Sequence, residues 1–276
     1  MRKLQLESFG VRLRLDFEDE EALVPVIDRL RFVFRDQIRI GNSGNHEHRF
    51  VIGRANGDET QVMDVYQRTR HPVASARLTK TIESMVRNKI AEYAVGKVFL
   101  HAGVVSIDGE ALVIPGRSRT GKSTLVNALL NHGAVYYSDE YAVIDKDGEI
   151  HPFAKPISLR STERDEGIEE VVPEELGIEV GHDPVPCKMV LLTEFVEGGK
   201  WSPFEVGNAA GVLKLIENSV GLRTNTCFSL KVLNKLALRA IIAQSCRSEA
   251  LETAIKLIEF FKRPSIGIQQ QGSNTS

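Results

Sequence analysis

The residues from Gly116 to Thr124 have the types and the spacing that bind a nucleotide phosphate. They fit the pattern G-x-x-x-x-G-K-[ST] in full. In such a loop, backbone N–H groups surround the phosphate oxygens, and the helix that follows directs its positive end at them. We expect Lys122 to reach the β- and γ-phosphates and the Ser123 hydroxyl to bind Mg²⁺. The candidate nucleotide-binding residues are Gly116, Arg117, Ser118, Arg119, Thr120, Gly121, Lys122, Ser123 and Thr124.

The flanks of this loop favour the same interpretation. An apolar run at 111–114 leads into the loop, and a helical pattern over 124–132 leads out of it. Strand, loop and helix therefore follow one another in the order that a phosphate-binding loop requires. The alternative is a glycine-rich turn that caps an ordinary helix.

Two acidic residues, Asp139 and Glu140, follow the loop after a short interval. They end a predicted strand, 17 residues after Lys122. Phosphoryl transfer needs a metal ion, a phosphate cradle and a group that handles the proton of the acceptor. Because one helix and one strand return the chain to the mouth of the loop, we expect Ser123, Asp139 and Glu140 to bind Mg²⁺ there. The alternative is an acidic pair at a solvated strand end.

This short interval separates the chain from two other classes of protein with the same loop. Transport ATPases place a signature and many residues between the loop and their acidic pair, and the chain contains no such signature. GTPases need the guanine-specifying pattern Asn-Lys-x-Asp. The nearest run, Asn234–Ala237, lacks the aspartate and lies within a helical pattern.

Hydrophobic periodicity predicts an α/β protein with a small N-terminal α/β domain over 1–95. Its strands are expected at 11–17, 49–53 and 61–66, and its helices over 19–30 and 78–93. Loop or turn residues are expected at 41–45 and at Gly57-Asp58. No chemical motif falls in this third of the chain.

A catalytic domain over 96–262, with a mixed sheet and a helical C-terminus, is expected to follow, and then a disordered tail over 263–276. Asp108-Gly109 predicts a hairpin between strands at 103–107 and 110–114. Gly133 is expected to end the helix of the loop. The other expected strands are 134–137, 141–145, 149–153 and 187–196, loops are expected over 154–186, and helices over 208–219, 229–243 and 248–262.

Composition narrows the class of partner. The chain has 35 Lys and Arg residues against 37 Asp and Glu residues, and the net charge of −2 gives no reason to expect nucleic acid or an anionic membrane as a partner. No apolar run approaches the length of a membrane span, and the N-terminus lacks the apolar core of a signal peptide. Cys187, Cys227 and Cys246 lack metal-ligand spacing, so we expect buried or half-buried thiols in a cytoplasmic protein.

These residues resemble the catalytic domain of HPr kinase/phosphorylase and, more closely, the broad bacterial group of HPr kinase-like proteins. The similarity is carried by His101-Ala-Gly103, the hairpin, the loop, Ser138-Asp139-Glu140 and the run His151–Arg160. It is specific over about 98–160 and does not reach the first third of the chain. It implies a P-loop kinase core related to phosphoenolpyruvate carboxykinase. It also implies transfer of the γ-phosphate of ATP, with Mg²⁺, to a serine hydroxyl, and a homo-oligomer.

The resemblance also implies roles for individual residues. Asp139 would accept the proton of the serine, and Glu140 would assist with the metal or with positioning. His101 would orient Asp139 or a phosphate, although a hydrogen-bonded histidine at a strand end is an equal alternative. Arg160 would stabilise the charge of the transition state, or would be an ordinary surface residue.

The chain departs from the family at two places. The first bears on how the nucleotide is seated, and the second bears on phosphorylase activity and on HPr as the acceptor. Arg119 stands where the family's loop has glycine, and Ser161–Gly167 replaces the glycine-rich stretch that is associated with dephosphorylation. We expect a serine of a small protein or peptide as the acceptor, gripped by residues 154–186 with Lys155, Arg160 and Arg164. The alternatives are a kinase for a small-molecule hydroxyl and a nucleotide-gated binding module without catalysis.

Overall fold

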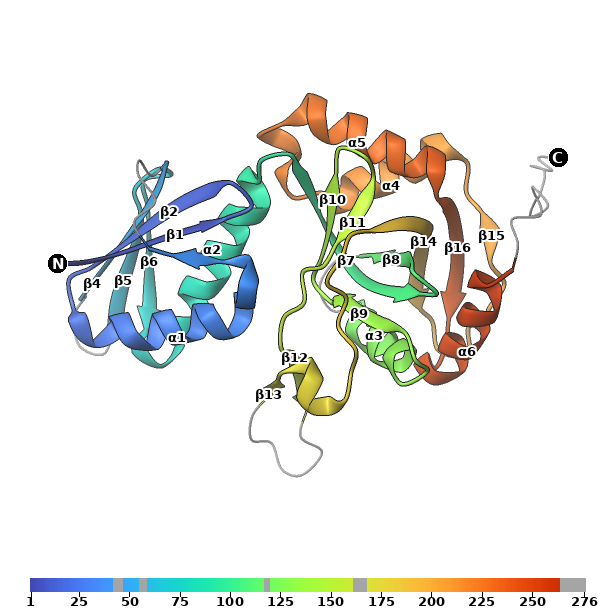
Figure 1. The fold of residues 1–276 in the computed structure, drawn as a ribbon, viewed down its shortest axis with the longest axis horizontal. Helices are drawn as coiled ribbons and strands as arrows, with labels where there is room; N and C mark the ends of the chain where they lie inside the picture. The colour runs from blue at the N-terminus through green and yellow to red at the C-terminus, as the bar shows by residue number, and fades with distance from the viewer. Residues whose placement is uncertain (42–46, 55–58, 117–119, 161–167, 264–276) are drawn as a thin grey trace. The chain divides into compact units, whose positions relative to one another are not determined.

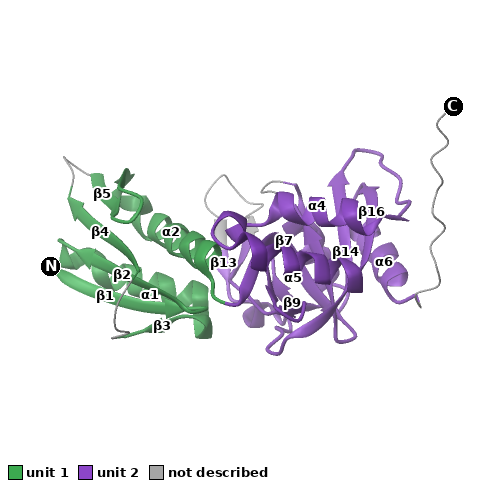
Figure 2. Ribbon diagram, turned by 90° about the horizontal axis from the view of Figure 1, so that it is seen from above, with its two compact units in different colours: residues 1–95 green, residues 96–276 purple. Residues whose placement is uncertain are grey.

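The computed structural model describes residues 1–41, 47–54, 59–116, 120–160 and 168–263. The chain has an α/β fold and divides into two compact units, residues 1–95 and 96–276 (Figure 1). Figure 2 shows unit 1 in green and unit 2 in purple. The expected loop at 42–45, the expected turn at Gly57-Asp58 and the expected tail from residue 264 onwards lie outside the described residues.

Unit 1 contains a six-stranded sheet in the order β3-β1-β2-β4-β5-β6 and two α-helices. Only β2 and β4 are parallel neighbours, and the other pairs are antiparallel. The strands are β1 (Arg2–Ser8), β2 (Val11–Phe17), β3 (Arg39–Ile40), β4 (His48–Arg54), β5 (Glu59–Asp64) and β6 (Thr69–Ala74), and the helices are α1 (Leu23–Phe34) and α2 (Leu78–Tyr93).

Hydrophobic periodicity explains how these elements bury their apolar sides. Leu13, Leu15 and Phe17 alternate along β2 and are fully buried. Asp19 caps a short 3-10 turn by accepting a hydrogen bond from the Glu21 N–H at 3.0 Å. Helix α1 follows this turn and ends at Phe34, beyond the expected end at residue 30.

Unit 2 contains an eight-stranded sheet in the order β11-β10-β7-β8-β14-β16-β15, with β9 paired to β7. β8, β14 and β16 are parallel to one another. Because β11 also pairs with β14, the strands β11, β10, β7, β8 and β14 form a closed ring. The strands are β7 (Lys97–Ile107), β8 (Glu110–Pro115), β9 (Val135–Ser138), β10 (Tyr141–Asp145), β11 (Glu149–His151), β14 (Val185–Phe195), β15 (Phe204–Glu205) and β16 (Ile241–Arg247).

Helices cover both faces of this sheet (Figure 1). Val113 of β8 packs in a cluster with Leu233 of α5, whereas the next residue, Ile114, packs in a cluster with Leu125 of α3 and Leu257 of α6. A strand that is buried on both faces reads as a continuous apolar run, as 111–114 does. The helices are α3 (Lys122–Leu130), α4 (Asn208–Asn218), α5 (Thr226–Arg239) and α6 (Ala250–Phe261).

Three expectations for the C-terminal half are wrong. The predicted helix over 229–243 ends at Arg239, and β16 begins two residues later, beside β14. Residues 154–186 are not all loop, because β12 (Ile157–Arg160) pairs with β13 (Ile168–Val171) as an antiparallel hairpin. All three cysteines are free, but Cys227, in the first turn of α5, is exposed.

None of the helices in the described part of the chain has both the length and the apolar character needed to cross a bilayer.

Candidate active site

The candidate phosphate-binding loop, of which the structure describes Gly116, Thr120 and Gly121, leads from β8 into α3. Gly121 is the N-cap of α3 and has a φ of +77°, a left-handed conformation that favours glycine. The first turn of a helix presents unsatisfied N–H groups, so this end can bind an anion. Ser123 and Thr124 are exposed in this turn. The expected ligands Arg117, Ser118 and Arg119 lie outside the described residues.

The backbone of β7 brings the loop and the acidic pair together. The carbonyl oxygen of His101 accepts a hydrogen bond from the Gly116 N–H at 3.1 Å. The next residue, Ala102, donates its N–H to the carbonyl oxygen of Glu140 at 3.1 Å. Two adjacent residues of one strand therefore fix the start of the loop and the acidic pair.

Gly103, also on β7, allows α3 to lie close against this strand. A Cβ atom on Gly103 would lie 2.6 Å from Cγ2 of Val126, well inside contact distance. The same Cβ atom would lie 3.9 Å from Cβ of Lys122. The glycine thus sets the distance between the strand that carries His101 and the helix that carries Lys122.

The acidic pair is held by a closed turn and by two neighbouring side chains. The buried Ser138 hydroxyl oxygen accepts hydrogen bonds from the N–H groups of Glu140 and Tyr141 at 3.1 and 3.0 Å. The Tyr136 hydroxyl donates to Oδ1 of Asp139 at 3.1 Å. The ammonium group of Lys155 lies 3.5 Å from Oδ1 of Asp139 and 3.1 Å from Oε2 of Glu140.

Electrostatics connect the loop to the acidic pair. Burial lowers the pKa of Lys122, and the negative charges of Asp139 and Glu140 partly oppose this shift. Lys122 therefore lies close enough to both carboxylates for their charges to raise its pKa. Burial, with a further contribution from Asp139, raises the pKa of Tyr136 well above its ordinary value. The Tyr136 hydroxyl consequently stays protonated and acts as a hydrogen-bond donor.

His101 lies on β7 within the candidate site, whereas Arg160 lies on β12 of a separate hairpin. The half-buried ring of His101 lies 4.8 Å from the ring of Tyr141, centroid to centroid. Its backbone is part of the site, and its action on Asp139 or a phosphate stays a prediction. Arg160 is the last residue of β12, and its side chain lies outside the described atoms.

Oxygen ligands from Ser123, Asp139 and Glu140 suit Mg²⁺, which binds to one or two carboxylates together with substrate phosphates. The position of Lys155 supports this fit, because a cation already lies between the two carboxylates. In the part of the chain that the structure describes, no group of three or more His, Cys, Asp or Glu side chains is placed to hold a metal ion.

Three residues near the site carry no sequence motif. Tyr136 and Lys155 contact the acidic pair. Arg247, 125 residues after Lys122, donates from Nη2 to the carbonyl oxygens of Thr120 and Gly121 at 3.3 and 2.9 Å. Lys155 lies within the run that resembles the family, which is a weak signal, whereas no local pattern indicates Arg247.

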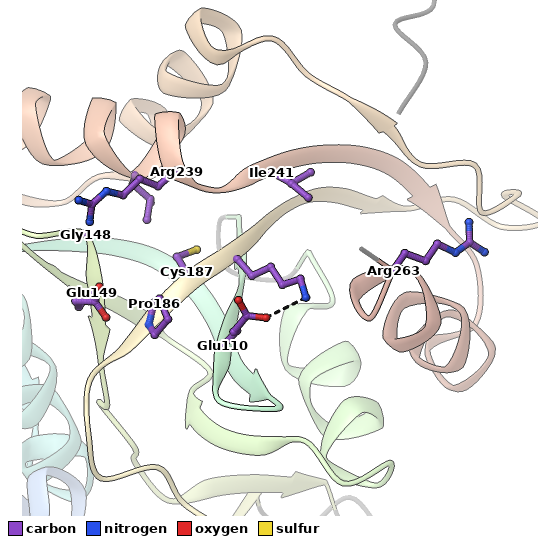
Figure 3. Close-up of a pocket in the computed structure, with 10 residues that line it drawn as sticks. Glu110, Gly148, Glu149, Pro186, Cys187, Arg239, Ile241 and Arg263 are labelled. Carbon is purple, nitrogen blue, oxygen red and sulfur yellow. Dashed lines mark ion pairs between the residues drawn. The ribbon is translucent and has the colours of Figure 1, made fainter. Parts of the chain in front are cut away.

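A cavity of about 370 Å³ lies at the opposite ends of β8, β14 and β16 from the candidate active site (Figure 3). It is lined by residues at the amino ends of these strands, including Glu110, Lys188 and Ile241. Lys188 and Glu110 form an ion pair at 2.9 Å within it. Because these strands are parallel and the phosphate-binding loop follows the carboxyl end of β8, the cavity and the candidate active site are separate.

No family model matches the chain, and no curated protein matches it. Among solved structures, the chain is similar to the HPr(Ser) kinase/phosphatase from Coxiella burnetii at 14% sequence identity and a TM-score of 0.31. The match covers 59% of this chain and 98% of that chain. This is a distant structural similarity, so the functional proposal rests on the residues and geometry described above.

Proposed function

We propose that the chain is an ATP- and Mg²⁺-dependent kinase that transfers the γ-phosphate to a serine hydroxyl of a small protein or peptide. The observation that carries this proposal is the junction on β7. Hydrogen bonds from Gly116 to His101 and from Ala102 to Glu140 join the start of the phosphate-binding pattern and the acidic pair to adjacent residues of one strand, which supports the proposal. We also propose the core related to phosphoenolpyruvate carboxykinase and the cytoplasmic location that the sequence predicts.

The loop and α3 supply the binding half of the site. N–H groups at the start of α3 would bind phosphate oxygens, and Lys122 would neutralise charge on the β- and γ-phosphates. A bound Mg²⁺ would add a Lewis acid on the phosphates. Ser123, Asp139 and Glu140 are the residues that would hold this ion.

Asp139 supplies the proton acceptor. The serine oxygen would form a bond to the γ-phosphorus while the bond from that phosphorus to the β–γ bridging oxygen breaks and ADP leaves. The serine proton would pass to a carboxylate oxygen of Asp139. Tyr136 and Lys155 both contact Oδ1, so we assign Oδ2 to the acceptor. Arg160 would steady charge on the transferred group or on the acceptor.

Two further functions are compatible with the same elements. A small-molecule hydroxyl could take the place of the serine. Alternatively, nucleotide binding could order a surface for a partner without catalysis. We favour transfer because Tyr136 and Lys155 orient Asp139 beside the loop, which a binding module does not require.

ADP release distinguishes these functions. We would measure release from Mg²⁺-ATP without acceptor, with free serine, and with a panel of serine-containing peptides and small proteins. Our proposal predicts release that depends on a peptide or protein, with phosphoserine on that acceptor. Release that depends on free serine would indicate the small-molecule kinase. Tight ATP binding without release under any condition would indicate the binding module.

A further inference from the structure

Arg247 is a buried cation behind the phosphate-binding loop. It is the last residue of β16 and is only 3% exposed. Nη2 donates to the carbonyl oxygens of Thr120 and Gly121 at 3.3 and 2.9 Å, and Nη1 donates to that of Ser248 at 3.4 Å. Within the described residues, no carboxylate forms an ion pair with Arg247.

These hydrogen bonds contribute to how the loop presents its N–H groups. The carbonyl oxygen of Gly121 also accepts a hydrogen bond from the Leu125 N–H at 3.2 Å, so Arg247 and helix α3 share this oxygen. A planar peptide unit directs its C=O and its N–H in opposite directions. A carbonyl group that points at Arg247 therefore turns the N–H group of the next residue away from Arg247. The N–H groups concerned are those of Gly121 and Lys122, which stand at the start of α3, where a phosphate would bind.

The approach of Arg247 also explains why residue 121 is glycine. A Cβ atom at this position would lie 2.3 Å from Nη2 of Arg247, so any side chain would displace the guanidinium group. The φ of +77° is a second and independent reason.

The buried positive charge of Arg247 has no ion-paired carboxylate among the described residues. Burial lowers the pKa of Arg247 because it disfavours the charged form, and Glu249 opposes this shift. The Nε atom is buried and has no hydrogen-bond partner among the described residues. A buried cation is unfavourable unless an anion compensates its charge. A phosphate group in the adjacent loop would provide that anion.

We propose that Arg247 is a positioning residue for the nucleotide phosphates. It holds the carbonyl groups of Thr120 and Gly121 on the side away from the phosphates. The N–H groups of Gly121 and Lys122 then face the phosphates, and the charge of Arg247 strengthens polyphosphate binding. This role rests on the proposed nucleotide site but not on the identity of the acceptor.

The test is calorimetric titration with Mg²⁺-ATP and with tripolyphosphate at several salt concentrations. Arg247→Met removes the donors and the charge but keeps an apolar stem. We expect it to bind both probes about 10-fold or more weakly, the loss expected for charge-assisted hydrogen bonds, and with a reduced dependence on salt. Arg247→Lys keeps the charge, so we expect a smaller loss and the salt dependence of the wild type.

The matched control is Arg239→Met, the same substitution at the exposed end of α5, just before β16 begins. We expect wild-type affinity for both probes. Circular dichroism and urea unfolding would show that each variant is folded.

Wild-type affinity and salt dependence in Arg247→Met would overturn the inference. If that variant does not fold, wild-type affinity in Arg247→Lys would overturn it instead, because one ammonium group cannot replace the forked donors to two carbonyls. A wild-type chain that binds neither probe would overturn the nucleotide site itself, and the inference with it. The two failures are therefore distinguishable.

Discussion

The hydroxyl group of Tyr136 donates a hydrogen bond to Oδ1 of Asp139 at 3.1 Å. Tyr136 is fully buried on β9, and Asp139 is half-buried just after the same strand. A buried ring thus fixes the orientation of the carboxylate that we assign as the proton acceptor.

Removal of this hydroxyl should slow phosphoryl transfer without weakening nucleotide binding. Tyr136→Phe keeps the ring in the core and removes the hydrogen bond to Asp139, which is worth about 1 kcal/mol. We expect kcat to fall about 3- to 10-fold while the affinity for ATP stays unchanged. Steady-state kinetics and ATP titration check this, and an unchanged kcat would show that Tyr136 does not orient Asp139.

Asp139 and Glu140 should differ in their effects. Asp139→Asn should lower kcat by roughly 10²- to 10⁴-fold, as expected for loss of a general base, with ATP binding largely retained. Glu140→Gln should mainly weaken the Mg²⁺ dependence of ATP binding. Calorimetric titration of ATP with and without Mg²⁺ separates these roles. Near-normal transfer by Asp139→Asn would contradict both roles proposed for this residue.

The close approach of β7 and α3 predicts a specific steric conflict. Gly103→Ala would place Cβ 2.6 Å from Cγ2 of Val126. We expect the free energy of unfolding to fall by about 1–3 kcal/mol, as for overpacking of a core, and ATP affinity to fall because α3 carries Lys122.

Adding Val126→Ala should relieve the conflict, so the double variant should be less destabilised than the sum of the single variants. Gly41→Ala is the control, because a Cβ atom there meets no atom of the described residues within 4 Å. Additive losses of stability in the double variant would show that this contact is not limiting.

Unit 1 should make the chain less stable as the pH falls. His48 is 2% exposed, and its ring lies 4.2 Å from that of Tyr93. Burial lowers the pKa of His48, and the nearby charge of Lys89 lowers it further, while Glu47 and then Asp64 oppose this shift. An unfolded histidine binds its proton at about pH 6.5, so the stability present above that pH is lost as the pH falls below it.

His48→Phe removes this titration and retains an aromatic ring. Urea unfolding at pH 7.5 and at pH 5.5 would compare the variant with the wild type. We expect the wild type to lose more stability over this range than the variant. Equal losses would mean that His48 titrates alike in the folded and unfolded chain.

Local patterns predict much of the fold. The spacing of apolar residues predicts α2 over 78–93, and the structure confirms both ends. Asp108-Gly109 predicts the hairpin of β7 and β8, and both residues have positive φ values. These features depend on residues that are close in the sequence, so single-sequence reasoning can reach them.

Strand β16 could not be predicted in the same way. Arg239, Ala240 and Ile241 pass from helix to strand without a glycine or a proline. The apolar residues after Ala240 continue the helical pattern of α5, and only their pairing with β14 makes them a strand. In contrast, β1 is missing from the predicted strands although the sequence contains the pattern of a half-buried strand: Leu4 and Leu6 alternate with polar residues.

The candidate site likewise contains residues that local patterns predict and residues that they do not. Lys122, Asp139 and Glu140 are marked by a motif and by a short interval, and the structure brings them within electrostatic reach. Lys155 and Arg247 reach the site through tertiary packing, at positions where no local pattern distinguishes a functional cation from a surface one. Their roles, like those of the predicted residues, are proposals that the experiments above address.

The most direct test of the central claim is Mg²⁺-dependent transfer of the γ-phosphate, compared between the wild type and Lys122→Ala. The control is Lys256→Ala, which removes an exposed lysine of α6 that forms a surface ion pair with Glu252 one turn away. We would follow transfer to a serine-containing acceptor in the presence of labelled ATP. We predict transfer by the wild type and by Lys256→Ala, none by Lys122→Ala, and a folded chain in each case. Transfer by Lys122→Ala at the wild-type rate would contradict the assignment of this loop as the phosphate-binding site of a kinase.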